Sequence, residues 1–381
     1  MKPPPAVRSP SAKEAVAVAA SGPLVLAGDI GATKSDLCLC RETESGLVTV
    51  REQKYRNQEW NCLEAIIDDF LSLEPEKPRA ACFGVAGPIR DNRVRMTNLG
   101  WTLDAVRLQD RFTIRQVALI NDLVAMALGT LELPSRDLKP INRGQADPAG
   151  AIGVLAPGTG LGEAFILRLP AGPLSDSQAV PPSNSRAVPP SNSRAVPLPC
   201  GSEGGHVDFA PRDELQIELL RYLRQRKAHV SVEDVCSGRA IPMLYDFLDS
   251  HTGAGERLLS FQDPDLDPTA AIVQAARRSL EGREGGSDLA VRALELFWDI
   301  LAAEAANLTL KVLCWGGIYI GGGMPPRILP FLKPDRFLDR FARGVYRDLL
   351  TAVPIHVILN PKTGLLGAAS RARALLREKS S

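Results

Sequence analysis

The chain has 381 residues, with 45 Lys and Arg against 44 Asp and Glu, and 45% of its residues are hydrophobic. That length suffices for two domains with substantial cores, and the balanced charge argues against nucleic acid or an anionic membrane as the main partner. The seven cysteines are scattered without a CxxC pair, which favours a reducing compartment without a disulfide framework or a zinc site. No stretch approaches the roughly 18 consecutive apolar residues of a membrane span.

The chain begins with residues 1–22, which are rich in proline and then in small apolar residues. The charge-free stretch at residues 15–20 is shorter than the roughly 7–15 apolar residues of a signal-peptide core. We therefore predict a disordered leader on a cytoplasmic protein, and import into an organelle through this leader stays open.

The first predicted element is a hairpin over residues 24–40. An apolar strand runs into Gly28 and Asp29, the chain turns at residues 31–33, and a second apolar strand follows. Such a turn lets backbone N–H groups converge on an anion, and the carboxylate suits a divalent cation that lies between it and a phosphate. The segment indicates a Mg-nucleotide site, although a plain hairpin is the simpler interpretation of this motif alone.

Strands and helices alternate in the next part of the chain. We predict helices at 60–73 and 123–131 and strands at 79–86 and 116–120. Asn121 and Asp122 directly follow the last of these strands, and ligands gather at the carboxyl ends of strands in open α/β sheets. Both residue types also favour helix N-caps, so a site and a cap stay equally open here.

The plan of the first hairpin returns at residues 152–167, where two apolar strands flank Gly158-Thr159-Gly160. A third glycine cluster, Gly321 to Gly323, follows a short strand at 318–320. Three glycine turns after strands, spread over two halves of the chain, suit a nucleotide in a cleft between domains.

A segment rich in proline and serine follows the second hairpin. Residues 179–186 (AVPPSNSR) recur verbatim at 187–194. Such a composition cannot bury a core, so we predict a surface-loop insertion at 170–199 without a catalytic role.

Glu203 and His206 follow the insertion and enclose two glycines. Because two interior glycines make a helix unlikely, we set aside a metal site built from a shared helix face. In a loop the pair offers a carboxylate and an imidazole to hydroxyl groups, and a connection with incidental polar residues is the alternative.

Helices dominate the remainder of the chain. We predict them at 212–226, from Ser231, and at 238–250, 267–280 and 287–310, with a strand at 354–359 and a closing helix from Thr363. Glu233 would then lie in the first turn of the helix from Ser231, where an acidic residue is favourable without any further role.

Taken in order, these segments closely resemble the ATP-dependent, bacterial-type glucokinase family of the actin-like sugar kinases. The resemblance runs from about Leu24 to the end and is broken only by the insertion. The matching motifs are GDIGATK (28–34), GVAGPI (84–89), MTNLGW (96–101), INDLVA (120–125), APGTGLG (156–162), EGGHVDFAP (203–211), VSVEDVCSG (230–238), GGGMPPR (321–327) and GLLGAA (364–369).

The resemblance implies a two-domain α/β fold, actin-like and ribonuclease H-like, with an interdomain cleft. Residues 23–132 with about 358–381 would form the small domain, and residues 133–357 the large one. It also implies a homodimer and transfer of the γ-phosphoryl group of MgATP to the 6-hydroxyl of glucose, as in glycolysis.

The roles of individual residues are likewise implied by the resemblance. Asp122 matches the general base, and the sugar ligands are Asn98, Asn121, Asp122, Glu203, His206 and Glu233. The nucleotide ligands are Gly28, Asp29, Ile30, Gly31, Ala32, Thr33, Gly158, Thr159, Gly160, Gly162, Gly321, Gly322 and Gly323. No side chain is expected to bind Mg²⁺ directly, and Asp29 is the candidate to reach the ATP-bound ion through water.

Three residues depart from the family pattern. Ala32 replaces a glycine, which would cost about 1 kcal/mol if the turn needed a positive φ; Lys34 replaces an asparagine and Leu99 a histidine. None of the three removes a proposed catalytic group, so we expect activity. A sugar- and nucleotide-binding regulator without turnover, or a kinase for another hexose, is the alternative.

Overall fold

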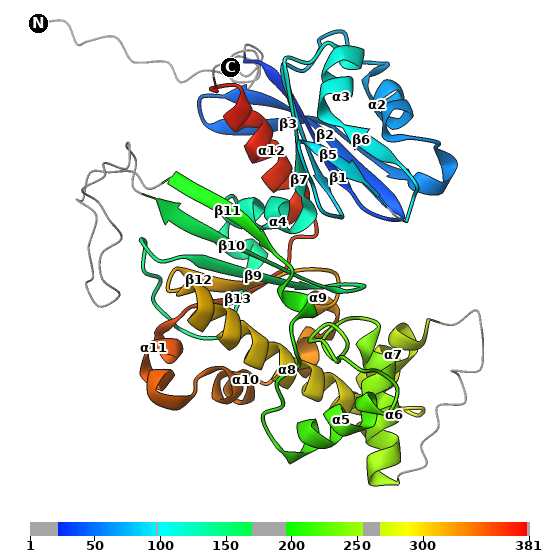
Figure 1. Cartoon of the computed structure of the whole chain (residues 1–381), viewed down its shortest axis with the longest axis vertical. Coiled ribbons are helices and arrows are strands. Elements are labelled where there is room, and N and C mark those ends of the chain that lie inside the picture. Colours follow the sequence, from blue (N-terminus) through cyan, green and yellow to red (C-terminus); the bar gives the residue numbers. More distant parts are fainter. Residues whose placement is uncertain (1–21, 97, 170–195, 254–266, 379–381) are drawn as a thin grey trace, which may run out of the picture. The chain divides into compact units, whose positions relative to one another are not determined.

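The computed structural model describes residues 22–96, 98–169, 196–253 and 267–378. The chain forms two compact units (Figure 1), a first unit of Met1–Glu132 with Lys362–Ser381 and a second unit of Leu133–Pro361. The predicted leader, apart from Gly22, and both copies of the eight-residue repeat lie outside the described residues.

The first unit is built on a five-stranded sheet with the strand order β3-β2-β1-β4-β7. Its strands are β1 (Leu24–Ile30), β2 (Lys34–Thr43), β3 (Gly46–Arg56), β4 (Ala80–Val85) and β7 (Gln116–Asn121). β1, β2 and β3 are antiparallel neighbours, whereas β1, β4 and β7 run parallel. β1 and β4 are almost wholly buried, as expected for strands covered by helices on both faces.

Helices cover both faces of this sheet (Figure 1). The remaining elements are η1 (Asn57–Glu59), α2 (Leu63–Leu71), β5 (Arg93–Arg95), β6 (Thr102–Asp104), α3 (Ala105–Phe112), α4 (Asp122–Thr130) and α12 (Thr363–Leu375). Val25 and Ala27 of β1 share a core with α12, while Leu24 and Leu26 share another with α2 and α3. The alternation along β1 thus sends successive side chains into two cores.

α4 and α12 pack closely enough to require glycine at their contact. A Cβ on Gly367 would overlap the carbonyl oxygen of Ala125, and one on Gly129 would overlap that of Thr363. This contact places the start of α12, at Thr363, against the last turn of α4, at Gly129.

The second unit has a six-stranded sheet with the order β11-β10-β9-β12-β13-β8. Its strands are β8 (Leu138–Pro140), β9 (Ile152–Pro157), β10 (Leu161–Leu169), β11 (Val196–Ser202), β12 (Gly317–Ile320) and β13 (Ile355–Ile358). β9, β10 and β11 are antiparallel neighbours, and β9, β12 and β13 run parallel. Apart from β8, this is the arrangement of the first sheet.

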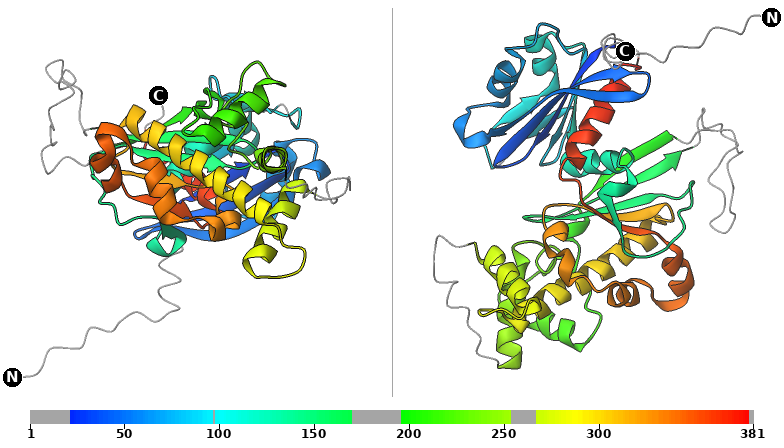
Figure 2. Two further views of the ribbon diagram at one scale, coloured as in Figure 1. Left: turned by 90° about the horizontal axis from the view of Figure 1, so that it is seen from below. Right: turned by 180° about the vertical axis from the view of Figure 1, so that it is seen from behind.

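The longest helix of the second unit, α8, is buried along most of its length. α6, α7 and α10 pack against it (Figure 1 and Figure 2). The helices of this unit are η2 (Ser135–Asp137), η3 (Gly204–His206), α5 (Glu214–Arg224), α6 (Ala240–Thr252), α7 (Pro268–Leu280), α8 (Asp288–Val312), α9 (Pro325–Ile328), η5 (Leu329–Phe331), α10 (Pro334–Phe341), η6 (Gly344–Tyr346) and α11 (Arg347–Ala352). In the described residues, no helix combines the length and the apolarity that crossing a membrane requires.

The structure confirms both predicted hairpins and corrects three local predictions. The end of the predicted loop at 170–199 is wrong, because β11 begins at Val196 and pairs with β10. The strand β11 tolerates its prolines because it lies at the edge of the sheet. Residues 204–206 form a short 3₁₀-helix rather than a loop.

The helix predicted from Ser231 is also wrong. Ser231 and Asp234 bond each other instead: the Ser231 N–H donates to Asp234 Oδ2 at 3.0 Å, and the Asp234 N–H donates to Ser231 Oγ at 3.3 Å. The Val232 N–H donates to the Val207 carbonyl. These bonds stabilise a turn, and the next helix, α6, starts at Ala240.

Candidate active site

The first glycine turn connects β1 to β2 at residues 31–33. The Gly31 N–H donates to the Lys34 carbonyl at 3.0 Å and closes the turn. Ala32 is not among the residues with positive φ, so the replacement of glycine causes no backbone strain here. Thr33 is exposed at the tip.

Three carboxylates lie near this turn at the carboxyl end of the sheet. Asp29 pairs across the strands with Asp36. Burial, together with the charges of Asp122 and Asp36, raises the pKa of Asp29 to about 6. Among the described residues, Asp36 Oδ1 is buried without a hydrogen-bond partner. A divalent cation would relieve this repulsion, so the residues suit the Mg²⁺ that the resemblance implies. No three His, Cys, Asp or Glu side chains of the described residues form a metal site, which fits an ion reached through water.

Asn121 and Asp122 lie where β7 ends and α4 begins. Asn121 Oδ1 accepts the N–H groups of Leu123 and Val124 at 2.9 and 3.4 Å, so this residue is a helix N-cap. Its Nδ2 donates to the Gly87 carbonyl at 3.4 Å. Asp122 is partly exposed, and its Oδ1 accepts the Leu123 N–H at 2.9 Å. Asn121 is therefore the N-cap of α4, and a role for Asn121 and Asp122 in sugar binding stays a prediction.

Asn98 is exposed in the loop between β5 and β6. The neighbouring Leu99 packs against the core shared with α2 and α3. This packing accounts for an apolar residue at position 99.

The second glycine turn, at residues 158–160, is held from two sides. The Gly238 N–H donates to the Gly158 carbonyl at 2.7 Å. The Leu161 N–H donates to Glu233 Oε2 at 2.8 Å. A Cβ on Gly160 would collide with the same carboxylate, so Glu233 lies directly against this turn.

The backbones of three predicted sugar ligands lie beside Gly205. The Glu233 N–H donates to the Gly205 carbonyl at 2.8 Å, and the His206 N–H donates to the Glu203 carbonyl at 2.9 Å. Glu203 and His206 are exposed. Gly205 is required because a Cβ there would collide with the Leu161 carbonyl.

The third glycine cluster lies beside the second turn. Gly322 has a φ of +85°, and a Cβ there would lie 2.6 Å from the Pro157 carbonyl oxygen. The Gly321 N–H donates to the Leu155 carbonyl at 2.8 Å. The cluster, which follows β12, therefore packs against the end of β9, the strand that leads into the 158–160 turn.

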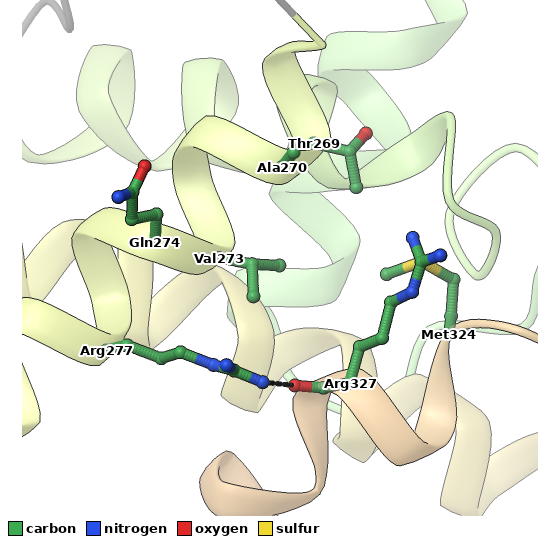
Figure 3. Close-up of a pocket in the computed structure, with 7 residues that line it drawn as sticks. All are labelled: Thr269, Ala270, Val273, Gln274, Arg277, Met324 and Arg327. Carbon is green, nitrogen blue, oxygen red and sulfur yellow. Dashed lines mark hydrogen bonds between the residues drawn. The ribbon is translucent and has the colours of Figure 1, made fainter.

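A cavity of about 350 Å³ opens between α7 and α9 (Figure 3). Its lining residues are Thr269, Ala270, Val273, Gln274, Arg277, Met324 and Arg327. The Thr269 hydroxyl donates to the Gly238 carbonyl at 2.8 Å, which links the cavity to the second glycine turn. Arg277 donates to the Arg327 carbonyl at 2.8 Å and joins the two helices.

These lining residues were not predicted from the sequence. On α7 they form part of an ordinary amphipathic pattern, and only the position of Met324 directly after the glycine cluster pointed to them.

Known proteins resemble this chain over nearly its whole length. The family model described as Glucokinase matches residues 26–175 and 187–375. A glucokinase of Nostoc punctiforme is 38% identical over 363 residues, covering 91% of this chain and 98% of the relative. The structure of a glucokinase from an Antarctic psychrotroph is 29% identical with a TM-score of 0.75, covering 92% and 99% of the two chains.

A more distant solved structure shares the fold. It is a ROK family glucokinase from Streptomyces griseus in complex with glucose and AMPPNP, 20% identical with a TM-score of 0.57, covering 92% of this chain and 99% of its own. From the family match, the close relatives and the two α/β units, we conclude that the chain belongs to the glucokinase family and has its two-domain sugar kinase fold.

Proposed function

We propose that the protein transfers the γ-phosphoryl group of ATP to the 6-hydroxyl of glucose. One observation carries the proposal: in the second unit, the backbone of Glu233 bonds Gly205, which lies between Glu203 and His206, and the Glu233 carboxylate accepts the Leu161 N–H directly after the glycine turn at 158–160. Groups suited to sugar hydroxyls thus adjoin a turn suited to phosphate. The Streptomyces griseus relative, solved with glucose and AMPPNP, supports the same pair of substrates.

The sugar-binding residues suit an uncharged, well-hydrated ligand. Carboxylates of Glu203 and Glu233 accept hydrogen bonds from hydroxyls, and the His206 imidazole can accept or donate. Asn98 and Asn121 complete the proposed set. A site built from oriented polar groups rejects analogues that lack one hydroxyl, because a buried partner would stay unpaired.

Asp122 is the proposed general base. It would accept the proton of the 6-hydroxyl as that oxygen attacks the γ-phosphorus. Asp122 lies at the end of β7, partly exposed, in the first turn of α4, where a carboxylate is favourable, and a carboxylate in reach of the substrate can serve as a general base.

The glycine turns would hold the phosphates through backbone N–H groups. Asp29 would reach Mg²⁺ through water, and the ion would neutralise charge on the phosphate oxygens. The nucleoside would occupy the α7–α9 cavity beside Gly321 to Gly323, with Val273 and Met324 as apolar contacts for the base.

The homodimer and the cytoplasmic location implied by the family remain predictions. Light scattering of the purified full chain would test the first, and fractionation of its source cells the second.

An ADP-release assay against a panel of hexoses, with and without Mg²⁺, tests the proposed reaction. We expect Mg²⁺-dependent release with glucose as the best substrate. A higher kcat/KM with another hexose would reassign the substrate, and binding of sugar and nucleotide without release would favour the regulator.

A further inference from the structure

Asn57 is a fully buried polar residue at the start of η1, far along the sequence from the first glycine turn but in contact with it. Its side-chain Nδ2 donates to the Gly31 carbonyl at 2.8 Å. Its Oδ1 accepts the hydroxyl of Ser35 at 2.7 Å, and its backbone N–H donates to the Thr33 carbonyl at 3.0 Å. Asn57 therefore bonds residues on both sides of the turn tip.

The bond to Gly31 fixes the direction of one peptide group in the turn. In a trans peptide the carbonyl and the following N–H point in opposite directions. Since the Gly31 carbonyl points toward Asn57, the Ala32 N–H must point away from it. Ser35, which is also fully buried, holds Oδ1 and so keeps Nδ2 turned toward Gly31.

Without this bond the peptide between Gly31 and Ala32 would be easier to rotate, because neither residue needs a positive φ and the turn has one backbone bond of its own, from Gly31 to Lys34. A site for phosphate depends on N–H groups that are aimed before the ligand arrives. The buried amide supplies that preorganisation without adding a charge next to the anion.

We propose that Asn57 is a positioning residue that aims the Ala32 N–H at a phosphate of the nucleotide. The inference rests on the proposed function, in which this turn binds phosphate. It assigns a nucleotide-specific role to a residue that would otherwise only close the corner between β3 and α2.

Asn57→Asp is the most informative substitution. It keeps the size of the side chain and an acceptor for the Ser35 hydroxyl, but it replaces the donor to Gly31 with an oxygen. Where ionised, it also adds a charge that Ser35→Ala does not add, so the two variants are compared. We expect the Kd for MgADP, measured by calorimetry, and the KM for ATP to rise about tenfold, and the KM for glucose to change less than about twofold.

Two further variants serve as comparisons for Asn57→Asp. Ser35→Ala leaves the bond to Gly31 but frees the amide to rotate, so a smaller rise of about threefold in the Kd for MgADP is expected. Gln58→Ala, at the exposed neighbour in η1, should change none of these constants. If Asn57→Asp does not fold, the comparison of Ser35→Ala with Gln58→Ala carries the test.

Gly31→Val separates this inference from the function on which it rests. If the wild type binds MgADP and Gly31→Val weakens binding while Asn57→Asp and Ser35→Ala do not, Asn57 has no positioning role. Equal losses for glucose and nucleotide in the Asn57 variant would likewise reduce it to a structural residue. If Gly31→Val has no effect, the turn does not bind phosphate, and the proposed nucleotide site itself is wrong.

Discussion

The two glycine hairpins follow one backbone plan, but different side chains hold their turns. Each joins two antiparallel neighbouring strands, β1 to β2 or β9 to β10, and each exposes a threonine, Thr33 or Thr159, at the tip. The first turn is held by the neutral amide of Asn57. The second is held by the carboxylate of Glu233, a predicted sugar ligand. Under the proposed function, the second hairpin would connect the sugar and phosphate subsites through Glu233, whereas the first would contact the nucleotide alone.

The hairpins also differ in charge. Asp29 precedes the last residue of β1, whereas Ala156 occupies that place in β9. Both hairpins carry an acidic group with a raised pKa, because burial raises the pKa of Asp29 to about 6 and that of Glu163 on β10 to about 8. What distinguishes the first hairpin is the carboxylate just before its turn, and under the proposed function the first hairpin would serve the cation and the second the sugar. The following substitutions test this division, beginning with the largest expected effect.

Asp122→Asn should lower kcat by about 10²–10⁴-fold, because the base is lost while hydrogen bonding to the sugar largely survives. The Kd for glucose, measured by calorimetry, should change only a few-fold. The same substitution at Asp110, which is exposed on α3, is the control. Near-normal turnover in Asp122→Asn would refute the assignment of the base.

Asp29→Asn should lower turnover about 100-fold at limiting Mg²⁺ and yet stabilise the ligand-free protein. The pKa of Asp29 is raised from 3.8 to about 6, so its ionised form destabilises the fold. That cost is fully present above about pH 6 and absent below about pH 4, and it amounts to about 3 kcal/mol at most.

Thermal unfolding of both proteins across this pH range checks the prediction for Asp29. The Tm difference should be positive near neutral pH and vanish toward pH 4. A Tm of the variant at or below that of the wild type near neutral pH would contradict the account of the acidic cluster.

Glu233→Gln should raise the KM for glucose about tenfold and the KM for ATP several-fold, because one carboxylate is proposed to serve both subsites. Glu203→Gln should raise only the KM for glucose. Measuring both constants in both variants sharpens the contrast between the hairpins. An unchanged KM for ATP in Glu233→Gln would mean that its bond to Leu161 does not couple the subsites.

The smallest effect is expected from a pair of glycine substitutions in the second turn. Gly160→Ala should disturb glucose binding a few-fold, because the new Cβ would displace the Glu233 carboxylate. Gly158→Ala should leave the KM for glucose unchanged, because a Cβ there meets no other atom within 4 Å. Equal glucose constants in the two variants would contradict the placement of Glu233 against the turn.

The sequence was sufficient to predict both hairpins, because glycine turns between apolar strands are local patterns. It was also sufficient for the family and the two-domain α/β fold. It could not predict the contact of Asn57 with Gly31 or that of Thr269 with Gly238, since tertiary packing brings these residues together. The same limit applies to Glu233. The sequence around it is typical of a helix start, but the segment forms a turn in which the Val232 N–H donates to the Val207 carbonyl.

The most direct test of the account is a phosphorus NMR time course of the full chain with glucose and MgATP, alongside Asp122→Asn. We predict that the wild type converts ATP into ADP and glucose 6-phosphate in equal amounts, while the variant forms almost no sugar phosphate. Release of inorganic phosphate in place of glucose 6-phosphate, or equal rates for the two proteins, would contradict it.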